Sequence, residues 1–500
     1  MPAGYEALAQ RYDLEVIPNW RRSFIAKTNT HKTDMKDGVI EEVFPSRYYP
    51  GDETGDHLEF ALKYDGTNLA ILAALFRIIP ETDFLKYLRS KRTGKYSRRL
   101  WFLYEFLTKK ILPIDDLHYG NYVNLLEPEE YYTISPSSKS SRHRINNNLP
   151  GNRLFCPLVR RTETLCEFEK TDFRKKFERV ASGYSRDVFN RALGYLYLKE
   201  TKSSFEIEHI QPSSKRTEKF ISLLRLAEEE DFCGKDNLIR IQNRIVEERF
   251  QEKDYRTNQN YVGETVSQGE ERIHYVSPKP EVLPGMMKGL IGVHQLYKKS
   301  PLHPIIHAGI ISWGFVFLHP FEDGNGRIHR FLIHNILATK DFTPRGVLFP
   351  VSACMLKNPE DYNASLESFS LPLKPLVEYT LDNEGRMTVH NDTEIWYRYI
   401  DMTLQVEALY KFIDRTIAEE LSEEMSFLAS YDEAKKAIRE IVDMPDRKID
   451  LFIKFCLQNN GRLSSRKRNA NFDFLSEEEI SGMEKAAQTA FSAGKQRNGK

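Results

Sequence analysis

Two apolar stretches on either side of a short glycine-rich turn stand out in the hydrophobic pattern of the chain. Residues 304–317 are apolar at nearly every position, which predicts a helix buried on all sides. After the turn, apolar residues recur at intervals of three or four, at Ile328, Phe331, Leu332 and Ile336. This spacing predicts a second helix that begins near Gly324. The turn therefore lies at the N-terminus of a helix.

The rest of the pattern also predicts a mainly α protein. Helical segments are expected over most of residues 5–112 and at 172–210, 236–250, 283–296, 359–369 and 395–417. Short strands are expected at 122–126 and 131–134, and two strands within 257–277 are expected to pair as a β-hairpin around residues 267–269. A helix–glycine–helix pattern follows residue 449, and the basic run within it, residues 466–468, would suit a winged-helix unit.

Length and composition favour several domains with substantial cores. A chain of 500 residues suggests about three domains. With 40% hydrophobic and 12% aromatic residues, the chain has enough apolar side chains to form a hydrophobic core in each. We expect an N-terminal mostly helical domain over residues 1–160 and a helical core with the hairpin over 161–375. Residues 376–500 are expected to form a C-terminal helical, winged-helix-like region.

Charge and cysteine content exclude some classes of protein. Lysine plus arginine equals aspartate plus glutamate, 72 each, so no global field attracts the chain to nucleic acid or membrane. The first residues carry no secretion signal and no apolar run is long enough to span a membrane, so we expect a cytoplasmic protein. The five cysteines are scattered without a Cys-x-x-Cys pair, which argues against a disulfide framework or a zinc site. Residues 89–99 are the densest basic run in the chain, and a nucleic-acid-binding patch there remains an alternative to a solvated helix end.

The signature segment, residues 318–330, carries the chemistry. Backbone N–H groups of Gly324 and Gly326 at a helix N-terminus make an anion site, to which the Asn325 amide could add a donor. Two arginines three residues apart can fork onto phosphate oxygens. A carboxylate in the turn could hold Mg²⁺ between two phosphates. A histidine at the rim of the turn can accept a proton from a hydroxyl.

This segment resembles the signature of the Fic family: a histidine, a phenylalanine two residues later, an acid two beyond it, then Gly-Asn-Gly-Arg and a second arginine. The resemblance implies a Fic-type helical core and a protein adenylyltransferase, which transfers AMP from ATP to a Ser, Thr or Tyr hydroxyl of a target protein. The residue roles that it implies are His319 as base, Asp323 for Mg²⁺, Gly324, Asn325 and Gly326 as anion hole, Arg327 for the inner phosphates and Arg330 for the γ-phosphate. A catalytically inactive phosphate-binding turn is the alternative.

A second segment, residues 203–210, resembles the inhibitory helix of many Fic proteins. Ser204 and Glu208 match its Ser/Thr and Glu, and a spacing of four residues puts both on one helix face. The resemblance implies that Glu208 pairs with Arg330 within the same chain and excludes the γ-phosphate, in the arrangement where the inhibitory helix precedes the signature. His209 stands where the family usually has Gly or Asn. Some members remove AMP instead, and Glu208 could then orient the water.

The resemblance also assigns the hairpin and one later helix. The hairpin at about 257–277, called the flap, would pair with the main chain of the target, with Val262 and Tyr275 as candidate contacts. Tyr362 and Asn363 are candidates for the adenine pocket. The partners are thus ATP and a protein bearing a hydroxyl side chain. In a third hypothesis the core only senses nucleotide while basic N- and C-terminal segments bind DNA. Whether the chain forms a homodimer is left open.

Overall fold

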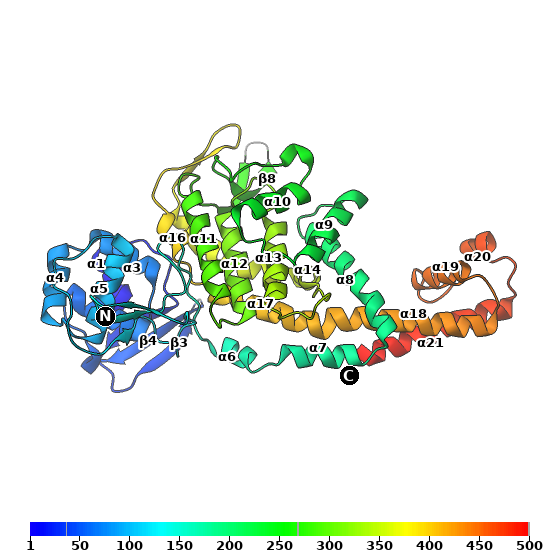
Figure 1. Ribbon diagram of the computed structural model, residues 1–500, viewed down its shortest axis with the longest axis horizontal. Helices are drawn as coiled ribbons and strands as arrows, with labels where there is room; N and C mark the ends of the chain where they lie inside the picture. Colours follow the sequence, from blue (N-terminus) through cyan, green and yellow to red (C-terminus); the bar gives the residue numbers. More distant parts are fainter. Residues whose placement is uncertain (37, 268–269, 499–500) are drawn as a thin grey trace. The chain divides into compact units, whose positions relative to one another are not determined.

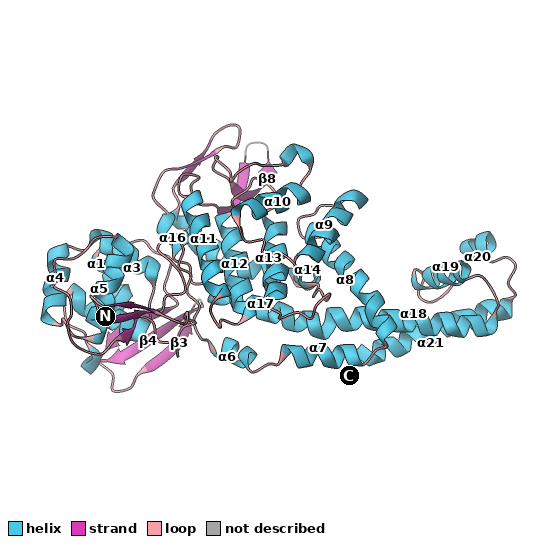
Figure 2. Cartoon of the chain, viewed as in Figure 1, coloured by secondary structure: helices cyan, strands magenta, loops and turns pink. Residues whose placement is uncertain are grey.

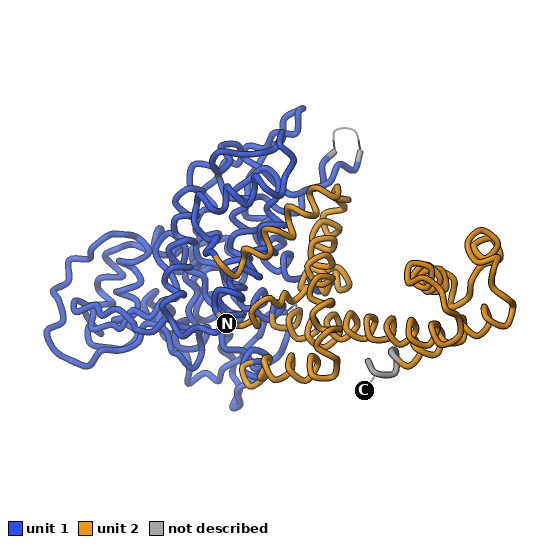
Figure 3. Tube along the Cα trace, turned by 45° about the vertical axis from the view of Figure 1, so that its right-hand side comes forward, with its two compact units in different colours: residues 1–168, 230–340, 360–409 blue, residues 169–229, 341–359, 410–500 orange. Residues whose placement is uncertain are grey.

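The computed structural model describes residues 1–36, 38–267 and 270–498, and most of its elements are helices (Figures 1 and 2). The predicted mainly α fold is therefore confirmed. The chain divides into two compact units, coloured in Figure 3. Unit 1 comprises residues 1–168, 230–340 and 360–409, and unit 2 comprises 169–229, 341–359 and 410–500. The three-domain division with boundaries at 160 and 375 stays a prediction.

Unit 1 begins with a sheet that the hydrophobic pattern did not predict. Strands β1 (Pro2–Ala3), β2 (Arg21–Ala26), β3 (Lys32–Lys36) and β4 (Val39–Pro45) form a four-stranded sheet in the order β1-β2-β4-β3. The edge strand β3 is exposed at all five residues and β2 starts with two arginines, so neither shows the alternation typical of a half-buried strand. Helices α1 (Gly4–Arg11), α2 (Thr54–Phe60), α3 (Leu69–Ile78), α4 (Glu81–Ser90) and α5 (Lys95–Thr108) complete this region, with short helical turns η1 (Ser46–Tyr48) and η2 (Ala61–Asp65).

The predicted strands after α5 are shorter than expected. Strands β5 (Val123–Asn124), β6 (Ser138–Ser140) and β7 (Ile145–Asn147) form a small sheet in the order β5-β7-β6, and helix α6 (Glu163–Glu169) follows. Of the strand predicted at 131–134, only Tyr131 pairs, in an isolated bridge to Arg160. Side-chain hydrogen bonds hold this segment in place as well as the strands do. The Tyr297 hydroxyl, for example, donates to the carbonyl oxygen of Pro150 at 2.6 Å.

The core that carries the signature segment is a stack of helices in the same unit. It contains α10 (Lys235–Ile245), η3 (Glu248–Phe250), α11 (Leu283–Lys298), α12 (Pro304–Leu318), α13 (Asn325–Thr339), α15 (Pro359–Leu373) and η4 (Lys374–Leu376). Helix α12 packs against both α11 and α13, and its side chains are buried almost throughout, as its sequence predicts (Figure 1). Gly314 makes this packing possible, because a Cβ there would lie 2.8 Å from Phe155 and from Leu290.

The long helix predicted at 395–417 is interrupted. Helix α16 (Glu394–Arg398) ends, and α17 (Thr403–Arg415) begins after an extended segment. In that segment the N–H of Leu158 donates to the carbonyl oxygen of Ile400 at 2.9 Å, and the N–H of Met402 donates to that of Leu158 at 2.8 Å. These bonds use backbone groups that a continuous helix would need for itself. The apolar spacing alone carries no sign of this pairing with a segment more than 200 residues earlier.

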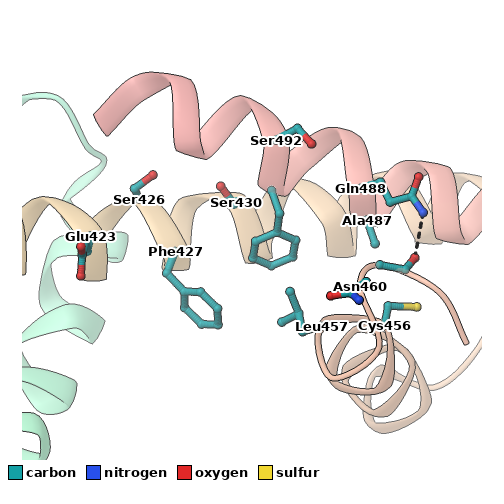
Figure 4. A pocket seen from close by; sticks show the side chains of 12 residues that line it. Glu423, Ser426, Phe427, Ser430, Cys456, Leu457, Asn460, Ala487, Gln488 and Ser492 are labelled. Carbon is teal, nitrogen blue, oxygen red and sulfur yellow. Dashed lines mark hydrogen bonds between the residues drawn. The ribbon is translucent and has the colours of Figure 1, made fainter. Parts of the chain in front are cut away.

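Unit 2 is helical. It contains α7 (Phe173–Ser182), α8 (Arg186–Glu206), α9 (Ser214–Leu226), α14 (Val351–Lys357), the π-turn η5 (Thr416–Glu420), α18 (Leu421–Ile441), α19 (Asp446–Leu457), α20 (Ser465–Asn471) and α21 (Glu477–Asn498). Helices α18 and α21 lie side by side, and a hollow of about 540 Å³ opens between them and α19 (Figure 4). Gln488 spans one end of this hollow, where its Nε2 donates to the carbonyl oxygen of Gly461 at 3.1 Å.

The predicted winged-helix character is not found. A winged helix needs a β-hairpin beside its helices, and the described residues 403–498 contain helices and connecting turns but no strand. Two residues of the basic run are engaged within the unit: Arg468 pairs with Glu477 at 2.6 Å, and Lys467 donates to Gln458 at 2.7 Å. This region therefore gives no support to the DNA-binding hypothesis.

The N-terminal basic segment, residues 89–99, is also used internally. Lys91 pairs with Asp56 at 3.0 Å and with Glu59 at 2.8 Å, and Arg99 pairs with Glu127 at 2.9 Å. Arg98 is buried and donates to the backbone carbonyl of Asn121 at 2.8 Å. Arg98 and Arg99 thus hold the segment after α5, and Lys91 pairs with acids of α2, so these cations give no support to a nucleic-acid-binding patch. Across the described residues, no helix combines the length and the apolar character that a membrane span requires.

Candidate active site

The signature segment forms a tight turn between α12 and α13, as the sequence predicts. Helix α12 ends at Leu318, and His319 follows in the left-handed region with a φ of 48°. Helix α13 begins at Asn325, preceded by Gly324 with a φ of 92°. A Cβ at Gly324 would also lie 3.2 Å from Val246, so both conformation and space favour glycine. The first N–H groups of α13 thus lie at the turn, where a helix N-terminus attracts anions.

The His319 side chain is held in a single tautomer. Its Nδ1 lies 3.1 Å from the carbonyl oxygen of Val316, which can only accept, so Nδ1 carries the proton. The other nitrogen, Nε2, is left as an acceptor. Burial lowers the pKa of His319 to about 4, against which the bond to Val316 acts in the raising direction. The imidazole is therefore a neutral base at physiological pH.

We expect the imidazole of His319 to stay neutral, with its proton on Nδ1, from pH 8 down to about pH 5. In this interval the unfolded chain, with an ordinary histidine pKa near 6.5, binds more protons than the folded chain, so this residue lowers folding stability as the pH falls below about 6.5. Nitrogen NMR of ¹⁵N-histidine protein would show both the tautomer and the titration, and loss of the signal in His319→Asn would assign it among 13 histidines. A titration midpoint near 6.5 would contradict the structure.

Asn325 and Phe321 close the turn on itself. The Asn325 side chain donates from Nδ2 to the carbonyl oxygen of Phe321 at 2.6 Å and accepts from the N–H of Phe321 at 3.1 Å. Phe321 is fully buried between Tyr255 and Phe315. Both polar atoms of the Asn325 amide thus make bonds within the turn, and its role as an extra anion donor stays a prediction. Its backbone N–H remains at the helix N-terminus.

Arg327 differs from expectation. Its guanidinium is fully buried and donates from Nη2 to Asp323 Oδ1 at 2.5 Å and from Nη1 to the carbonyl oxygen of Ile245 at 3.1 Å. Arg327 and Asp323, four residues apart, therefore form a pair at the start of α13. In this arrangement Arg327 orients the carboxylate and fixes α10 to the turn, and it does not reach outward beside Arg330 as the three-residue spacing had suggested.

Asp323 fits the role of a Mg²⁺ ligand. Its side chain is 41% exposed, so a carboxylate oriented by Arg327 lies at the surface of the turn. No group of three or more His, Cys, Asp and Glu that could hold a metal occurs among the described residues. Mg²⁺ is usually held by one or two carboxylates together with phosphates and water, so a single aspartate beside an anion site suits it.

Arg330 is buried on α13 and directed toward α15. Its Nη1 donates to the Tyr362 hydroxyl at 3.4 Å. Tyr362 itself is buried, and its ring lies 6.2 Å from that of His329. Asn363, the next residue of α15, is exposed. The structure thus brings Tyr362 to the guanidinium predicted to hold the γ-phosphate, while the assignment of Tyr362 and Asn363 to an adenine pocket stays a prediction.

The predicted hairpin forms next to the turn. Strands β8 (Tyr261–Ser267) and β9 (Glu270–Val276) pair antiparallel with Val262 opposite Tyr275, and residues 268–269 of the predicted connection lie outside the described residues. The two candidate contacts differ: Val262 is 42% exposed, whereas Tyr275 is buried and donates from its hydroxyl to the carbonyl oxygen of Phe317. Tyr275 therefore anchors the flap to α12, and only Val262 is placed to touch another chain.

Several residues that support the turn were not predicted. Arg256 is buried, and its guanidinium donates to the carbonyl oxygens of His319, Asn258 and Pro278 at 2.8, 2.7 and 2.6 Å. It thereby joins both ends of the flap to the histidine. Asn260 donates to the carbonyl oxygen of Phe321 at 3.0 Å. No sequence signal marks these residues, because their types are ordinary and they lie about 60 positions from their partners.

Removing the guanidinium of Arg256 is expected to destabilise the protein by about 2–5 kcal/mol, because three interior carbonyl groups lose their donors. Chemical denaturation of Arg256→Met would measure the loss, and hydrogen exchange should locate it at residues 256–262 and 318–322. Arg272→Met is the matched control, since the Arg272 side chain is 63% exposed on the flap and should change stability by less than about 0.5 kcal/mol. Equal effects of the two substitutions would contradict the role given to Arg256.

A polar cleft of about 1040 Å³ opens beside His319. His319 and Glu322 of the turn line it, together with residues 257–261 at the start of the flap and residues 279–281 after it. Its remaining wall belongs to a second hairpin, in which β10 (Tyr379–Leu381) pairs with β11 (Met387–Val389), and consists of β11 and the turn before it. No sequence pattern predicts this hairpin at the site.

The predicted inhibitory residues lie in unit 2, at the end of α8. Ser204 is buried within the helix, but α8 ends at Glu206 and Glu208 lies in the following turn, where its N–H donates to the carbonyl oxygen of Phe205 at 3.1 Å. The predicted helix face shared by Ser204 and Glu208 is therefore not continuous. His209 has a φ of 55°, in the left-handed region that Gly and Asn favour. This conformation gives a physical reason for the Gly or Asn usual at that position.

Comparison with known proteins identifies the class. Residues 232–337, which span α10 to the end of α13, match the model of the Fic/DOC family. The chain therefore contains a Fic/DOC-family domain, and this domain is the helical core that carries the turn.

Named relatives agree with this assignment. The chain is 27% identical over 164 residues to the protein adenylyltransferase fic-1 of Caenorhabditis elegans, covering 32% of this chain and 29% of the relative. It is 33% identical over 113 residues to the protein adenylyltransferase Fic of Nematostella vectensis, covering 22% and 24%. The match thus spans less than a third of either relative. A crystal structure of a Fic family protein from Desulfovibrio desulfuricans G20 aligns with a TM-score of 0.38 and 17% identity, covering 56% of this chain and 80% of that one.

Proposed function

We propose that the protein transfers AMP from ATP to a Ser, Thr or Tyr hydroxyl of a target protein. The observation that carries the proposal is the position of His319, which lines a polar cleft, keeps Nε2 as an acceptor, and stands in the turn that leads into the N-terminus of α13. A base, an anion site and an open cleft are the parts that attack of a hydroxyl on a nucleotide requires. Relatives named as protein adenylyltransferases support the same chemistry.

The reaction follows from this arrangement. The acceptor hydroxyl gives its proton to Nε2 of His319 while its oxygen forms a bond to the α-phosphorus. The bond from that phosphorus to the oxygen between the α- and β-phosphates breaks, and pyrophosphate leaves with the electron pair. The N–H groups of Gly324, Asn325 and Gly326 would hold the phosphate oxygens on which negative charge grows, and Arg330 would hold the γ-phosphate.

Asp323 would hold Mg²⁺ in this scheme. Bound there, the ion would neutralise charge on the α- and β-phosphates. Arg327 takes a supporting role, because it keeps the Asp323 carboxylate in place through the 2.5 Å bond and offsets part of its charge. The Asp323–Arg327 pair thus prepares a ligand for the ion before the nucleotide arrives.

We further propose that Glu208 inhibits the enzyme by competing with the γ-phosphate for Arg330. The proposal rests on the resemblance of Ser204 and Glu208 to the inhibitory motif, since Glu208 and Arg330 belong to different units. An acid that occupies the outer guanidinium leaves the triphosphate without its γ anchor, so the α-phosphorus is not aligned for attack. The Ser204 hydroxyl, buried in the last turns of α8, would help to fix the turn that carries Glu208.

Position-specific labelling of ATP tests the transferred group. The purified chain, as wild type and as Glu208→Gly, is incubated with a cell lysate, Mg²⁺ and ATP labelled at either the α- or the γ-phosphate. Covalent label on protein that appears only when the chain is added is expected from α-labelled ATP and not from γ-labelled ATP, because the γ-phosphate leaves with pyrophosphate. Label from γ-labelled ATP would indicate a kinase, and protein label from neither would contradict group transfer to protein.

A further inference from the structure

The hairpin β10–β11 beside the cleft is stabilised by hydrogen bonds within the hairpin itself. Strand β10 pairs antiparallel with β11, and the turn between them is closed by Asp382, whose Oδ1 accepts the N–H groups of Glu384 and Arg386, each at 2.9 Å. Gly385 supplies the left-handed residue of the turn, with a φ of 74°. These bonds, chiefly that from Arg386, lower the pKa of Asp382, so the turn keeps its charge and shape over the physiological pH range.

The hairpin is fixed to the flap. The Tyr261 hydroxyl, on the first residue of β8, donates to the carbonyl oxygen of Gly385 at 3.1 Å. Lys374, in the turn η4 that precedes β10, donates to the carbonyl oxygen of Ile273 on β9 at 2.8 Å. The two hairpins therefore lie beside each other (Figures 1 and 2), and residues of both line the cleft next to His319.

The cleft suits a peptide better than a small molecule. Its volume of about 1040 Å³ is at the upper end of small-molecule pockets, which are mostly apolar, whereas this cleft is lined largely by polar and charged residues. The charged residues that line it are Lys279, Glu281, Glu322, Asp382 and Arg386. An extended protein segment with polar side chains fits such a surface, and the flap offers strand edges along which its main chain can pair.

Arg386 is the residue of the hairpin best placed to bind an acidic side chain of an acceptor protein. Its side chain is 74% exposed at the turn, and it pairs with Glu384, which is 67% exposed and only two residues away. Exposed pairs of this kind are weak, so Arg386 can exchange Glu384 for an acid of another chain at little cost. Lys279, the other cation of the lining, lies on the flap side of the cleft.

We propose that the β10–β11 hairpin determines specificity for the acceptor protein. It selects an extended polar segment with an acidic side chain close to the modified hydroxyl, and Arg386 binds that acid. This inference rests on the proposed AMP transfer and adds to it the chemistry of the substrate. The hairpin acts by binding the acceptor and takes no part in the transfer of AMP itself. Its effect should therefore appear in KM for the acceptor and not in kcat.

Synthetic peptides provide the test. Short peptides with a central Ser, Thr or Tyr, and with each flanking position set in turn to Glu, Ala or Lys, are modified by the full chain with α-labelled ATP, in the wild-type and Glu208→Gly backgrounds. Arg386→Glu is expected to lower kcat/KM by about fivefold for the best Glu-containing peptide, through KM, and to favour Lys at the same position. The control Asn383→Glu adds a charge to the same exposed turn at a residue that does not line the cleft.

The possible failures are distinguishable. If AMP reaches the peptides and Arg386→Glu behaves like Asn383→Glu, the inference about the hairpin is wrong while the proposed function stands. If no peptide or protein is labelled in either background, both are wrong. The affinity for ATP in the absence of peptide, measured by titration calorimetry, should not fall in Arg386→Glu, because the hairpin contacts the acceptor only. A drop there would mean that the substitution damages the nucleotide side, and would overturn a role confined to the acceptor.

Discussion

His319→Ala is expected to lower the rate of AMP transfer by about 10²–10⁴-fold while the Kd for Mg·ATP changes by less than about twofold. The substitution removes the nitrogen that takes the proton from the acceptor, but it leaves the N–H groups of α13, Asp323 and Arg330 in place. The backbone at residue 319 should also persist, because the bond from Arg256 is to its carbonyl oxygen. Single-turnover labelling from α-labelled ATP and titration calorimetry measure the two quantities.

A matched control is His118→Ala, which removes an exposed histidine far from the turn in sequence. It should leave both rate and affinity unchanged. Loss of ATP affinity together with transfer in His319→Ala would show that the histidine shapes the nucleotide site, and not that it acts as a base. Full retention of transfer would remove His319 from the mechanism.

Glu208→Gly is expected to raise the rate of AMP transfer by about 5–150-fold, the range of a typical coupling between an inhibitory element and a ligand site. The physical reason is the release of Arg330 for the γ-phosphate. Glu206→Gly is the matched control, because Glu206 is an exposed acid at the end of the same helix, two residues away. It changes the net charge equally and should have little effect on transfer.

The same variant separates transfer from removal of AMP. A target that already carries AMP is incubated with wild type and with Glu208→Gly. If the physiological reaction is removal, with Glu208 orienting water, the variant should lose that activity. If it is transfer, the wild type should leave the adduct largely intact and the variant should not accelerate its loss. Reduced transfer in Glu208→Gly would contradict the inhibitory role.

Local patterns predicted the centre of the fold well. Residues 304–317 and the three-or-four spacing after Gly324 gave helices that the structure has as α12 and α13, with the turn between them. The apolar run needs burial on every side, and the glycines mark where the chain reverses, so these features depend on neighbours in sequence. The flap was equally visible, because alternating residues on both sides of a turn need only each other to pair.

Features that depend on distant partners were not predictable. From the sequence, Arg256 cannot be distinguished from an ordinary surface cation. The structure shows that it is buried and that its guanidinium donates to three carbonyl groups. Asn325 and Arg327 have the types expected of phosphate ligands, yet their side chains bond to Phe321, Asp323 and Ile245. The break before α17 has the same origin, since it depends on pairing with Leu158. Residue types indicate which chemistry is available, whereas the packing decides which atoms remain to perform it.

Intact-mass spectrometry of the purified full chain can show whether AMP is transferred to protein and whether the transfer needs His319. Glu208→Gly is incubated with ATP and Mg²⁺. The double variant Glu208→Gly/His319→Ala is incubated separately under the same conditions. We expect a mass gain of one AMP for each modified hydroxyl in the single variant, and no gain in the double variant. A gain that persists without His319, or a gain of phosphate in place of AMP, would contradict this expectation.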